Sequence, residues 1–136
     1  MKYRIGIILM ILCQSTVVPA ADYHPGVVSK EVMKTTTTVI GQPIVYPNAV
    51  RPQVTASIVE IPPGGETGWH AHKAPLYAWL TAGALTVEYE GGRTMGFHEG
   101  EPIIESVHIP HNGRNTGVKP AKLLVFTLGD GEVPGK

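Results

Sequence analysis

The sequence has almost no cysteine, few aromatic side chains and no excess of charge. Its one cysteine is Cys13, and aromatic and charged residues make up 7% and 16% of the 136 residues. The 11 basic and 11 acidic residues balance, which gives no electrostatic reason to expect nucleic acid or an anionic membrane as a partner. After residue 20, no stretch has the 3.6-residue apolar period of an amphipathic helix.

Turn-forming residues are abundant instead. The chain has 16 glycines and 12 prolines, while its hydrophobic content of 43% argues against disorder. Many short strands joined by tight turns fit these counts better than helices do. The length suffices for one domain with a core of its own and is too small for two comfortable domains.

The first 20 residues are typical of a secretory signal peptide. Lys2 and Arg4 form a positive start, residues 5–12 are apolar, and small or apolar residues end at Ala20. The apolar run is too short for a membrane span, so we expect no membrane anchor; a lipid on Cys13 is a minor alternative. Cleavage after Ala20 predicts a periplasmic or secreted protein without cysteine, hence without a disulfide or a thiol nucleophile.

The rest of the chain predicts an all-β, single-domain sandwich or barrel. We expect an N-terminal arm with edge strands over residues 21–52, a barrel core over residues 53–130 and a tail over residues 131–136. Strands are expected at residues 31–40, 42–47, 54–61, 76–81, 85–89, 93–98, 102–105 and 122–128, each bounded by glycine, proline or polar turn residues.

Three histidines form the candidate metal site. On an extended strand, His70 and His72 project from the same face, with α-carbons about 7 Å apart. His111 comes from a distant strand and can complete the set. Neutral imidazole suits Zn, Cu, Fe or Ni better than the hard, oxygen-preferring cations. An isolated His-x-His is more often a pair of partly exposed polar residues, so the neighbouring residues decide its meaning.

Those neighbours resemble the two motifs of the cupin superfamily. The first motif corresponds to Gly64, His70, His72 and Gly83, and the second to Gly100, His111 and Asn115. The resemblance extends from about residue 61 to residue 127 and includes features of small exported bacterial cupins. It implies a double-stranded β-helix, or jelly-roll barrel, with one divalent metal (Fe, Ni, Zn or Mn) held by His70, His72 and His111. It also implies a homodimer and a small-molecule ligand. Asn115 then has a structural role through its amide.

Two features depart from that pattern. In the second motif, Ser106-Val107-His108 replaces the usual Pro-x-Gly before the histidine, and Glu105 is the nearby carboxylate. Leu76 stands where cupins usually carry a ligand glutamate, and the adjacent Tyr77 can offer a phenolic oxygen only through a one-residue bulge. Otherwise Tyr77 packs beside Trp79 on the face away from the metal. Glu105 is a fourth ligand, a general base, a group that orients a histidine, or a surface charge. Glu105 and Tyr77 are the candidate catalytic residues, and solvent is the first candidate for the remaining coordination position.

Three classes of function follow. A metal enzyme would be an Fe(II) dioxygenase or a lyase or isomerase in which Glu105 or Tyr77 handles the proton. A binding or sensory cupin would hold a small ligand without catalysis. In a structural protein, the metal would only stabilise the fold. Arg114 would lie at the rim, and His98 and His108 would face water.

Overall fold

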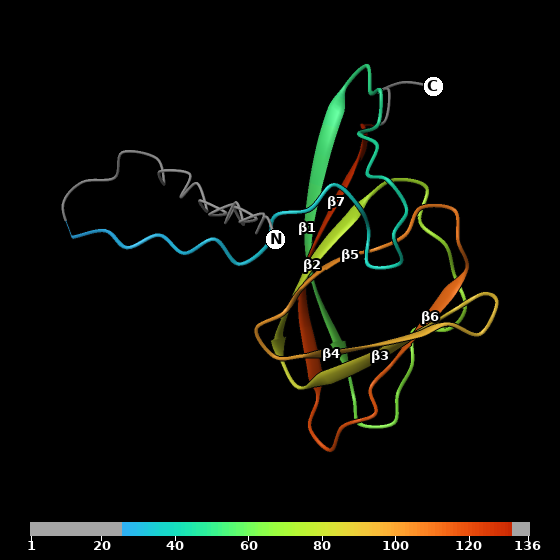
Figure 1. Cartoon of the computed structure of the whole chain (residues 1–136). Helices are drawn as coiled ribbons and strands as arrows, with labels where there is room; N and C mark the ends of the chain where they lie inside the picture. Colours follow the sequence, from blue (N-terminus) through green and yellow to red (C-terminus); the bar gives the residue numbers. More distant parts are fainter. Residues whose placement is uncertain (1–25, 132–136) are drawn as a thin grey trace, which may run out of the picture. The chain divides into compact units, whose positions relative to one another are not determined.

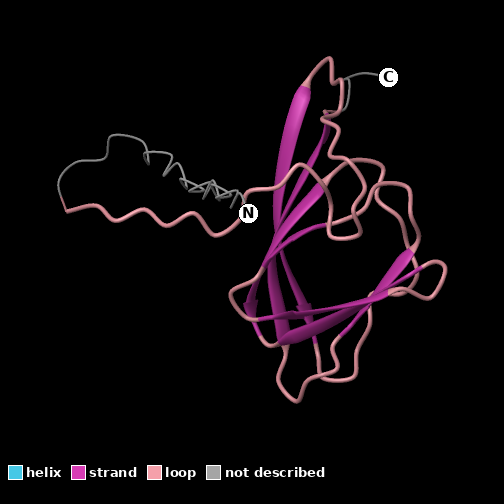
Figure 2. Ribbon diagram, in the orientation of Figure 1, coloured by secondary structure: helices cyan, strands magenta, loops and turns pink. Residues whose placement is uncertain are grey.

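The computed structural model describes residues 26–131, and the expected signal peptide lies outside the described residues. The chain divides into two compact units, Met1–Glu31 and Val32–Lys136. The described part of the first unit, residues 26–31, is exposed and forms no strand. Within the described residues the regular structure consists of strands alone, which confirms the expected all-β class (Figure 2). Nor does any described residue belong to a helix long and apolar enough to cross a membrane.

The strands in the described part of the second unit form two antiparallel sheets. One has the strand order β1-β7-β2-β5 and the other the order β4-β3-β6 (Figure 1). The strands are β1 (Pro52–Ile61), β2 (Leu76–Ala82), β3 (Ala84–Tyr89), β4 (Thr94–His98), β5 (Pro102–Ile104), β6 (His111–Arg114) and β7 (Ala121–Asp130).

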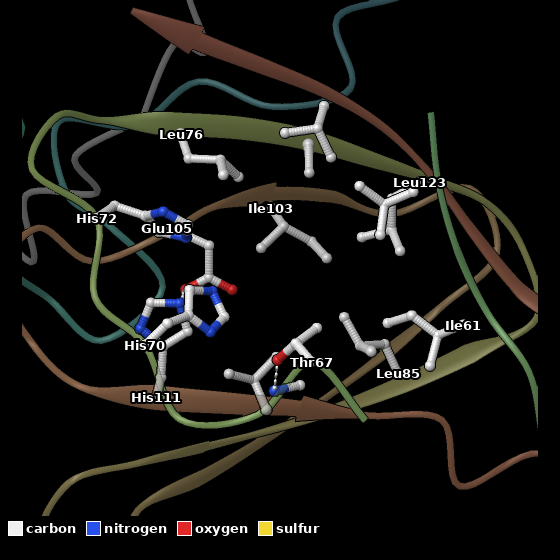
Figure 3. A pocket seen from close by; sticks show the side chains of 15 residues that line it. Ile61, Thr67, His70, His72, Leu76, Leu85, Ile103, Glu105, His111 and Leu123 are labelled. Atoms are coloured by element: carbon white, nitrogen blue, oxygen red, sulfur yellow. Dashed lines mark hydrogen bonds and ion pairs between the residues drawn. The ribbon is translucent and has the colours of Figure 1, made fainter. Parts of the chain in front are cut away.

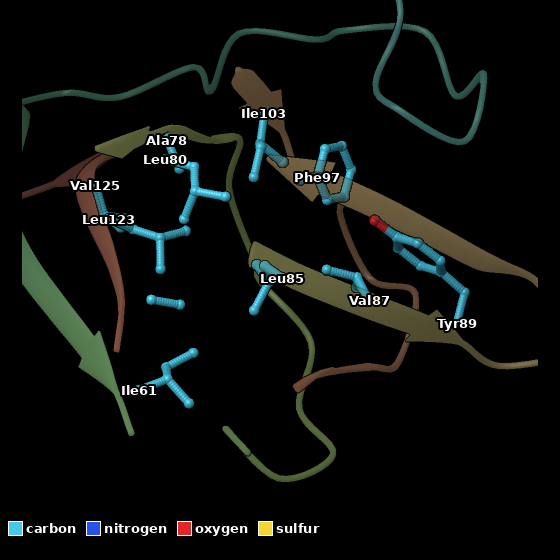
Figure 4. Close-up of a cluster of buried hydrophobic side chains, with 11 residues drawn as sticks. Ile61, Ala78, Leu80, Leu85, Val87, Tyr89, Phe97, Ile103, Leu123 and Val125 are labelled. Carbon is cyan, nitrogen blue, oxygen red and sulfur yellow. The ribbon is translucent and has the colours of Figure 1, made fainter. Parts of the chain in front are cut away.

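Alternating side chains of β3 and β7 form much of the core. In β3 the side chains of Leu85, Val87 and Tyr89 are buried, because every second residue of a strand points to the same face. In β7, Leu123 and Val125 follow the same period. Figure 4 shows these side chains facing one another from the two sheets, with those of β1 and β2 beside them. The core therefore fills the space between the sheets.

Gly83 makes the tight connection between β2 and β3. Its φ of +82° lies in the left-handed region that side chains disfavour. A Cβ at this position would also stand 2.6 Å from the backbone oxygen of Pro120, closer than non-bonded atoms approach. Glycine is therefore required here on both counts, which explains the spacing that the sequence shows.

Asn115 fastens the end of β6 to its surroundings. The side chain is fully buried, and its Nδ2 donates to the backbone oxygens of Ile61, at 2.9 Å, and of Lys119, at 2.8 Å. Its Oδ1 accepts from the N–H of Gly117 at 2.9 Å. The amide thus satisfies three backbone groups, in agreement with the expected structural role.

The strand expected at residues 31–40 is absent. This segment forms a single bridge, between Thr37 and Pro43, and turns back at Gly41, where φ is +88°. The N–H of Thr38 donates to the oxygen of Gln42 at 2.8 Å, which closes the turn. The run of threonines has high β-propensity, but that propensity depends on a neighbouring strand to pair with. Here the segment forms hydrogen bonds with residues 42–44, and the N–H of Val39 donates to the oxygen of Ile104 at 3.0 Å. The strand expected at residues 42–47 is likewise reduced to the bridge at Pro43.

Candidate metal centre

The connection between β1 and β2 carries two of the three histidines. The sequence predicted them on a strand, but they lie at isolated bridges: His70 pairs antiparallel with His111, and His72 pairs parallel with Val107. The N–H of His108 donates to the oxygen of His72 at 2.8 Å. Pro62 and the glycines after it interrupt the strand before His70. The backbone is nevertheless extended at both bridges, so both imidazoles still project to one side.

The three imidazoles converge on one point. One ligand atom of each of His70, His72 and His111 lies within 4.8 Å of the other two, a separation at which one metal ion can bind all three. The ring centroids of His70 and His111 are 4.6 Å apart. The ring centroid of His72 lies 5.0 Å from that of His70 and 4.9 Å from that of His111. Figure 3 shows the three rings gathered at one end of a cavity.

Backbone carbonyls fix the tautomers of two of these histidines. Nδ1 of His70 lies 2.8 Å from the oxygen of Gly68, and Nδ1 of His111 lies 2.8 Å from the oxygen of Ile109. A carbonyl oxygen only accepts hydrogen bonds, so each Nδ1 carries the proton and donates it. The lone pair of each neutral ring is then on Nε2, which is the arrangement of a metal-ligating histidine.

His72 is kept neutral by its environment. Burial, with smaller contributions from the neighbouring His111 and His70, lowers its pKa from 6.5 to about 4. At neutral pH its imidazole therefore has a free lone pair, as metal binding requires. Together with the Nδ1 hydrogen bonds of the other two rings, this shows that the donor set fits a divalent transition metal.

Glu105 stands beside the histidines and is held by a tyrosine. Its side chain is buried, with Oε2 3.8 Å from Nε2 of His111. The O–H of Tyr89 donates to the same oxygen at 3.0 Å. Burial raises the pKa of Tyr89 far above its usual range, and the charge of Glu105 raises it further, so the phenol stays protonated and donates. The surface-charge interpretation of Glu105 is therefore wrong.

The structure does not bring Tyr77 to the histidines. Leu76 lines the cavity beside them, and Tyr77, the next residue of β2, points to the other face of the sheet. The irregularity in the β2 register lies between Leu80 and Ala82, so there is no bulge to turn the phenol of Tyr77 inward. Its oxygen is buried without a hydrogen-bond partner among the described residues.

The cavity has a volume of about 150 Å³ and two chemically different ends. The histidines and Glu105 lie at one end, where His70 is nearest the surface. The rest of the lining is mainly aliphatic, and the labelled Ile61, Leu85 and Leu123 lie at the opposite end in Figure 3. A ligand in this cavity would therefore have its polar part at the histidines.

A polar network attaches the histidine-bearing connection to β6. The carboxylate of Glu66 accepts hydrogen bonds from Asn112, at 3.0 Å, and from Arg114, at 2.8 Å. These two hydrogen bonds and the charge of Arg114 lower the pKa of Glu66. The hydroxyl of Thr67 accepts from the N–H of Gly113 at 2.9 Å. Arg114 thus lies at the exposed rim, paired with Glu66.

Sequence reasoning missed Tyr89, the Nδ1 acceptors and β6. Tyr89 has the same parity in β3 as Leu85 and Val87, so its inward direction could have been found from the alternation. The partner of its hydroxyl could not, because Glu105 directly follows β5, which belongs to the other sheet. The strand β6 consists of His-Asn-Gly-Arg, a sequence with no β-propensity signal of its own. His98 and His108 are exposed, as expected.

The family comparison agrees with this architecture. The sequence model of the cupin domain matches residues 57–127, which is more than half of the chain and includes all three histidines. This chain belongs to the cupin superfamily. No curated protein matches it.

Solved structures with the same fold include several cupins and enzymes. The DMSP lyase DddQ of Ruegeria pomeroyi is 28% identical, with a TM-score of 0.51, over 59% of this chain and 40% of that one. The oxalate decarboxylase of Lactobacillus farciminis, in a formate complex, is 26% identical, with a TM-score of 0.50, over 54% of this chain and 23% of that one. The Cnp3 cupin domain of Schizosaccharomyces pombe, 19% identical with a TM-score of 0.51 over 57% and 56%, shows the fold alone.

Proposed function

We propose that this cupin binds one divalent transition metal through Nε2 of His70 and His111 and a ring nitrogen of His72, and acts on a small organic molecule there. One observation carries the proposal: the Nδ1 hydrogen bonds of His70 and His111 leave two Nε2 lone pairs directed at the site. Neutral His72 adds the third nitrogen. Iron, nickel, zinc and manganese all accept such a set to different degrees.

The chemistry that the site supports best is proton abstraction from a carbon acid, as in a lyase or isomerase. When bound, the metal supplies Lewis acidity at the histidine end of the cavity. Glu105 then serves as the general base, because its carboxylate is buried 3.8 Å from His111 and has few other partners. Tyr89 holds the carboxylate by its 3.0 Å hydrogen bond and keeps it in one orientation.

The comparisons support the same class. Of the three solved structures described above, the two that are more than 25% identical are named as a lyase and a decarboxylase. Their substrates are properties of those proteins, which share less than half of their length with this chain. What this chain has in common with them is a cupin barrel, and the proposed base, Glu105, is argued from its own geometry.

An Fe(II) dioxygenase is the second candidate. The ligand atoms that lie within 4.8 Å of one another belong to the three histidines and not to Glu105. A three-histidine set leaves open positions on the ion, which oxygen-dependent chemistry requires. Oxygen uptake with catechols or diketones, absent under the lyase proposal, distinguishes the two.

Deuterium exchange tests the preferred proposal. The metal-loaded protein should catalyse exchange of the acidic C–H of small ketones and thioethers bearing a carboxyl or carbonyl group. Glu105→Gln should keep the metal and lose the exchange, whereas Glu101→Gln, a change at an exposed glutamate, should lose neither. Metal-loaded protein without exchange on this panel, or exchange undiminished in Glu105→Gln, would contradict the role of Glu105. In that case a non-catalytic ligand-binding or sensory cupin becomes the better explanation.

Export and self-association are further parts of this proposal. Residues 1–20 support export to the periplasm or medium, with cleavage after Ala20. An apolar outer face of the four-stranded sheet, which includes Val54, Ile58 and Phe126 at 61%, 69% and 39% exposure, supports a homodimer. Mass spectrometry of the exported chain and sedimentation equilibrium test these two points; an uncleaved chain or a monomer at micromolar concentration would contradict them.

A further inference from the structure

We propose that the cavity selects a small ligand with an uncharged hydrocarbon body and a single oxygen-bearing end. The hydrocarbon body lies among the aliphatic side chains, and the oxygens face the histidines. The position of the oxygens rests on the proposed metal site, whereas the apolar selection rests on the cavity alone. The proposed ligand is thereby narrowed from any small organic molecule to molecules with a hydrocarbon body and one oxygen-bearing end.

Apart from Thr67, the polar side chains of the cavity lie at one end. The aliphatic part is formed by residues from several strands of both sheets and includes Ile61, Leu76, Leu85, Ile103, Leu123 and Val125. Thr67 is the one polar lining residue besides the histidines and Glu105. Its hydroxyl already accepts from the N–H of Gly113 and lies 3.1 Å from the oxygen of Gly68, to which it donates. The body of a ligand therefore meets no free hydrogen-bonding group.

The charges around the cavity disfavour an anionic body. No lysine or arginine is present among the described residues that line it. Arg114 is engaged with Glu66 at 2.8 Å on the exposed side of β6. Glu105 contributes a negative charge at the polar end, so a second carboxylate or a phosphate on the ligand would have no cationic partner inside. A buried charge without a partner is costly, and buried hydroxyl groups without partners are costly too.

The available space sets the size of the ligand. A volume of about 150 Å³ corresponds to that of an engineered apolar cavity that stays dry and binds benzene. The whole cavity, polar end included, therefore has room for a ligand of roughly that size. Sugars, sugar phosphates and dicarboxylic acids are excluded by polarity, and long acyl chains are excluded by volume.

A series of alkylhydroxamic acids tests the selection with one constant head group. We would titrate cobalt-loaded protein with aceto-, butyro- and hexanohydroxamic acid and follow the cobalt absorption spectrum. Each added methylene should tighten binding about fourfold until the cavity is filled, because one buried methylene contributes about 0.8 kcal/mol. A terminal carboxylate on the hexano compound should abolish the gain. Equal affinities along the series, or tighter binding of the carboxylate, would overturn the proposal.

Two variants show where the alkyl chain lies. Ala78→Leu adds bulk to a buried lining position and should abolish the chain-length dependence while leaving the cobalt content unchanged. Ala78→Val does the same with less bulk if the leucine variant fails to fold. Ala56→Leu, on the exposed strand β1, is the matched control and should keep the full dependence. Retention of the dependence in folded Ala78→Leu would place the alkyl chain elsewhere and contradict the proposal.

A metal-free measurement separates this inference from the metal site. In protein labelled at its methyl groups, 1-butanol and 1-hexanol should shift the resonances of Leu85, Leu123 and Val125, hexanol at the lower concentration. The exposed Val54 and Val118 serve as controls. If the protein takes up no cobalt but shows these shifts, the proposed function fails and the apolar selection stands. If the control methyls respond as strongly as the cavity methyls, the apolar selection fails whatever the metal content.

Discussion

His70 and His111 exchange both of their backbone hydrogen bonds: the N–H of His70 donates to the oxygen of His111 at 3.0 Å, and the N–H of His111 donates back at 2.8 Å. Residues paired in this way in antiparallel strands have α-carbons about 5.5 Å apart. The backbone itself therefore sets the distance between two of the proposed metal ligands. The side-chain hydrogen bonds to Gly68 and Ile109 then set the orientation of the rings.

Replacement of Tyr89 by phenylalanine should separate catalysis from metal binding. The variant loses the 3.0 Å hydrogen bond to Glu105 but keeps the ring that packs in the core. We expect an unchanged metal content and a rate of carbon-acid exchange lowered about 10- to 100-fold, as is typical for groups that orient active-site residues. Exchange rates and metal analysis on the same samples provide the measurement. An undiminished rate would show that Glu105 needs no hydrogen bond from Tyr89.

Asn115→Leu should destabilise the barrel strongly. The change leaves the backbone oxygens of Ile61 and Lys119 and the N–H of Gly117 without their partner. Each buried polar group left unsatisfied costs about 1–3 kcal/mol, so a loss of about 3 kcal/mol in the free energy of unfolding is expected. Urea unfolding measures it. Asn48→Leu, at an exposed position, is the control and should change stability little. Equal stabilities of the two variants would contradict the structural role of Asn115.

The stability of the metal-free protein should decrease as the pH falls from 6.5 to 4. His72 has a pKa near its ordinary 6.5 in the unfolded chain and a pKa lowered to about 4 in the folded chain, chiefly by burial. Between these pH values the unfolded chain binds a proton at His72 and the folded chain does not. The free energy of unfolding therefore decreases as the pH falls from 6.5 to 4, and the contribution of His72 is fully present above pH 6.5.

Urea unfolding at pH 7, 5.5 and 4.5 provides the measurement for His72. His72→Asn should flatten the dependence in this window, because its side chain does not titrate. His98→Asn, at an exposed histidine, should retain the dependence of the original protein. If all three proteins lose stability equally, other groups are responsible and the account of His72 is wrong.

The sequence was sufficient for the fold class and for the neighbourhood of the histidines, but not for the local geometry. The position of Gly83 in the sequence indicates a close contact in the fold, because only glycine fits where the β2–β3 connection passes the backbone of Pro120. The alternation of apolar and polar residues in β3 and β7 likewise identifies the side chains that form the core. The strand predicted from the run of threonines was wrong, because strand formation depends on a pairing partner that the local sequence does not specify.

Contacts between distant segments were beyond sequence reasoning. The environment of Glu105 depends on Tyr89 from β3 and on His111 from β6. Neither pairing leaves a local pattern, so the sequence allowed a surface charge and a buried base alike. Tyr77 was a similar case: its direction depends on whether β2 has a bulge beside it, and the bulge lies further along, between Leu80 and Ala82.

Metal stoichiometry tests the central claim most directly. The protein is purified without added metal, stripped with a chelator and reloaded with Co(II), Ni(II) or Zn(II). It should then bind about one equivalent of metal, as measured by elemental mass spectrometry after dialysis. Single changes of His70, His72 or His111 to alanine should each weaken binding at least about 10-fold, while His98→Ala should bind as the original does. No uptake of any of these metals, or full uptake in folded His111→Ala, would contradict the three-histidine site.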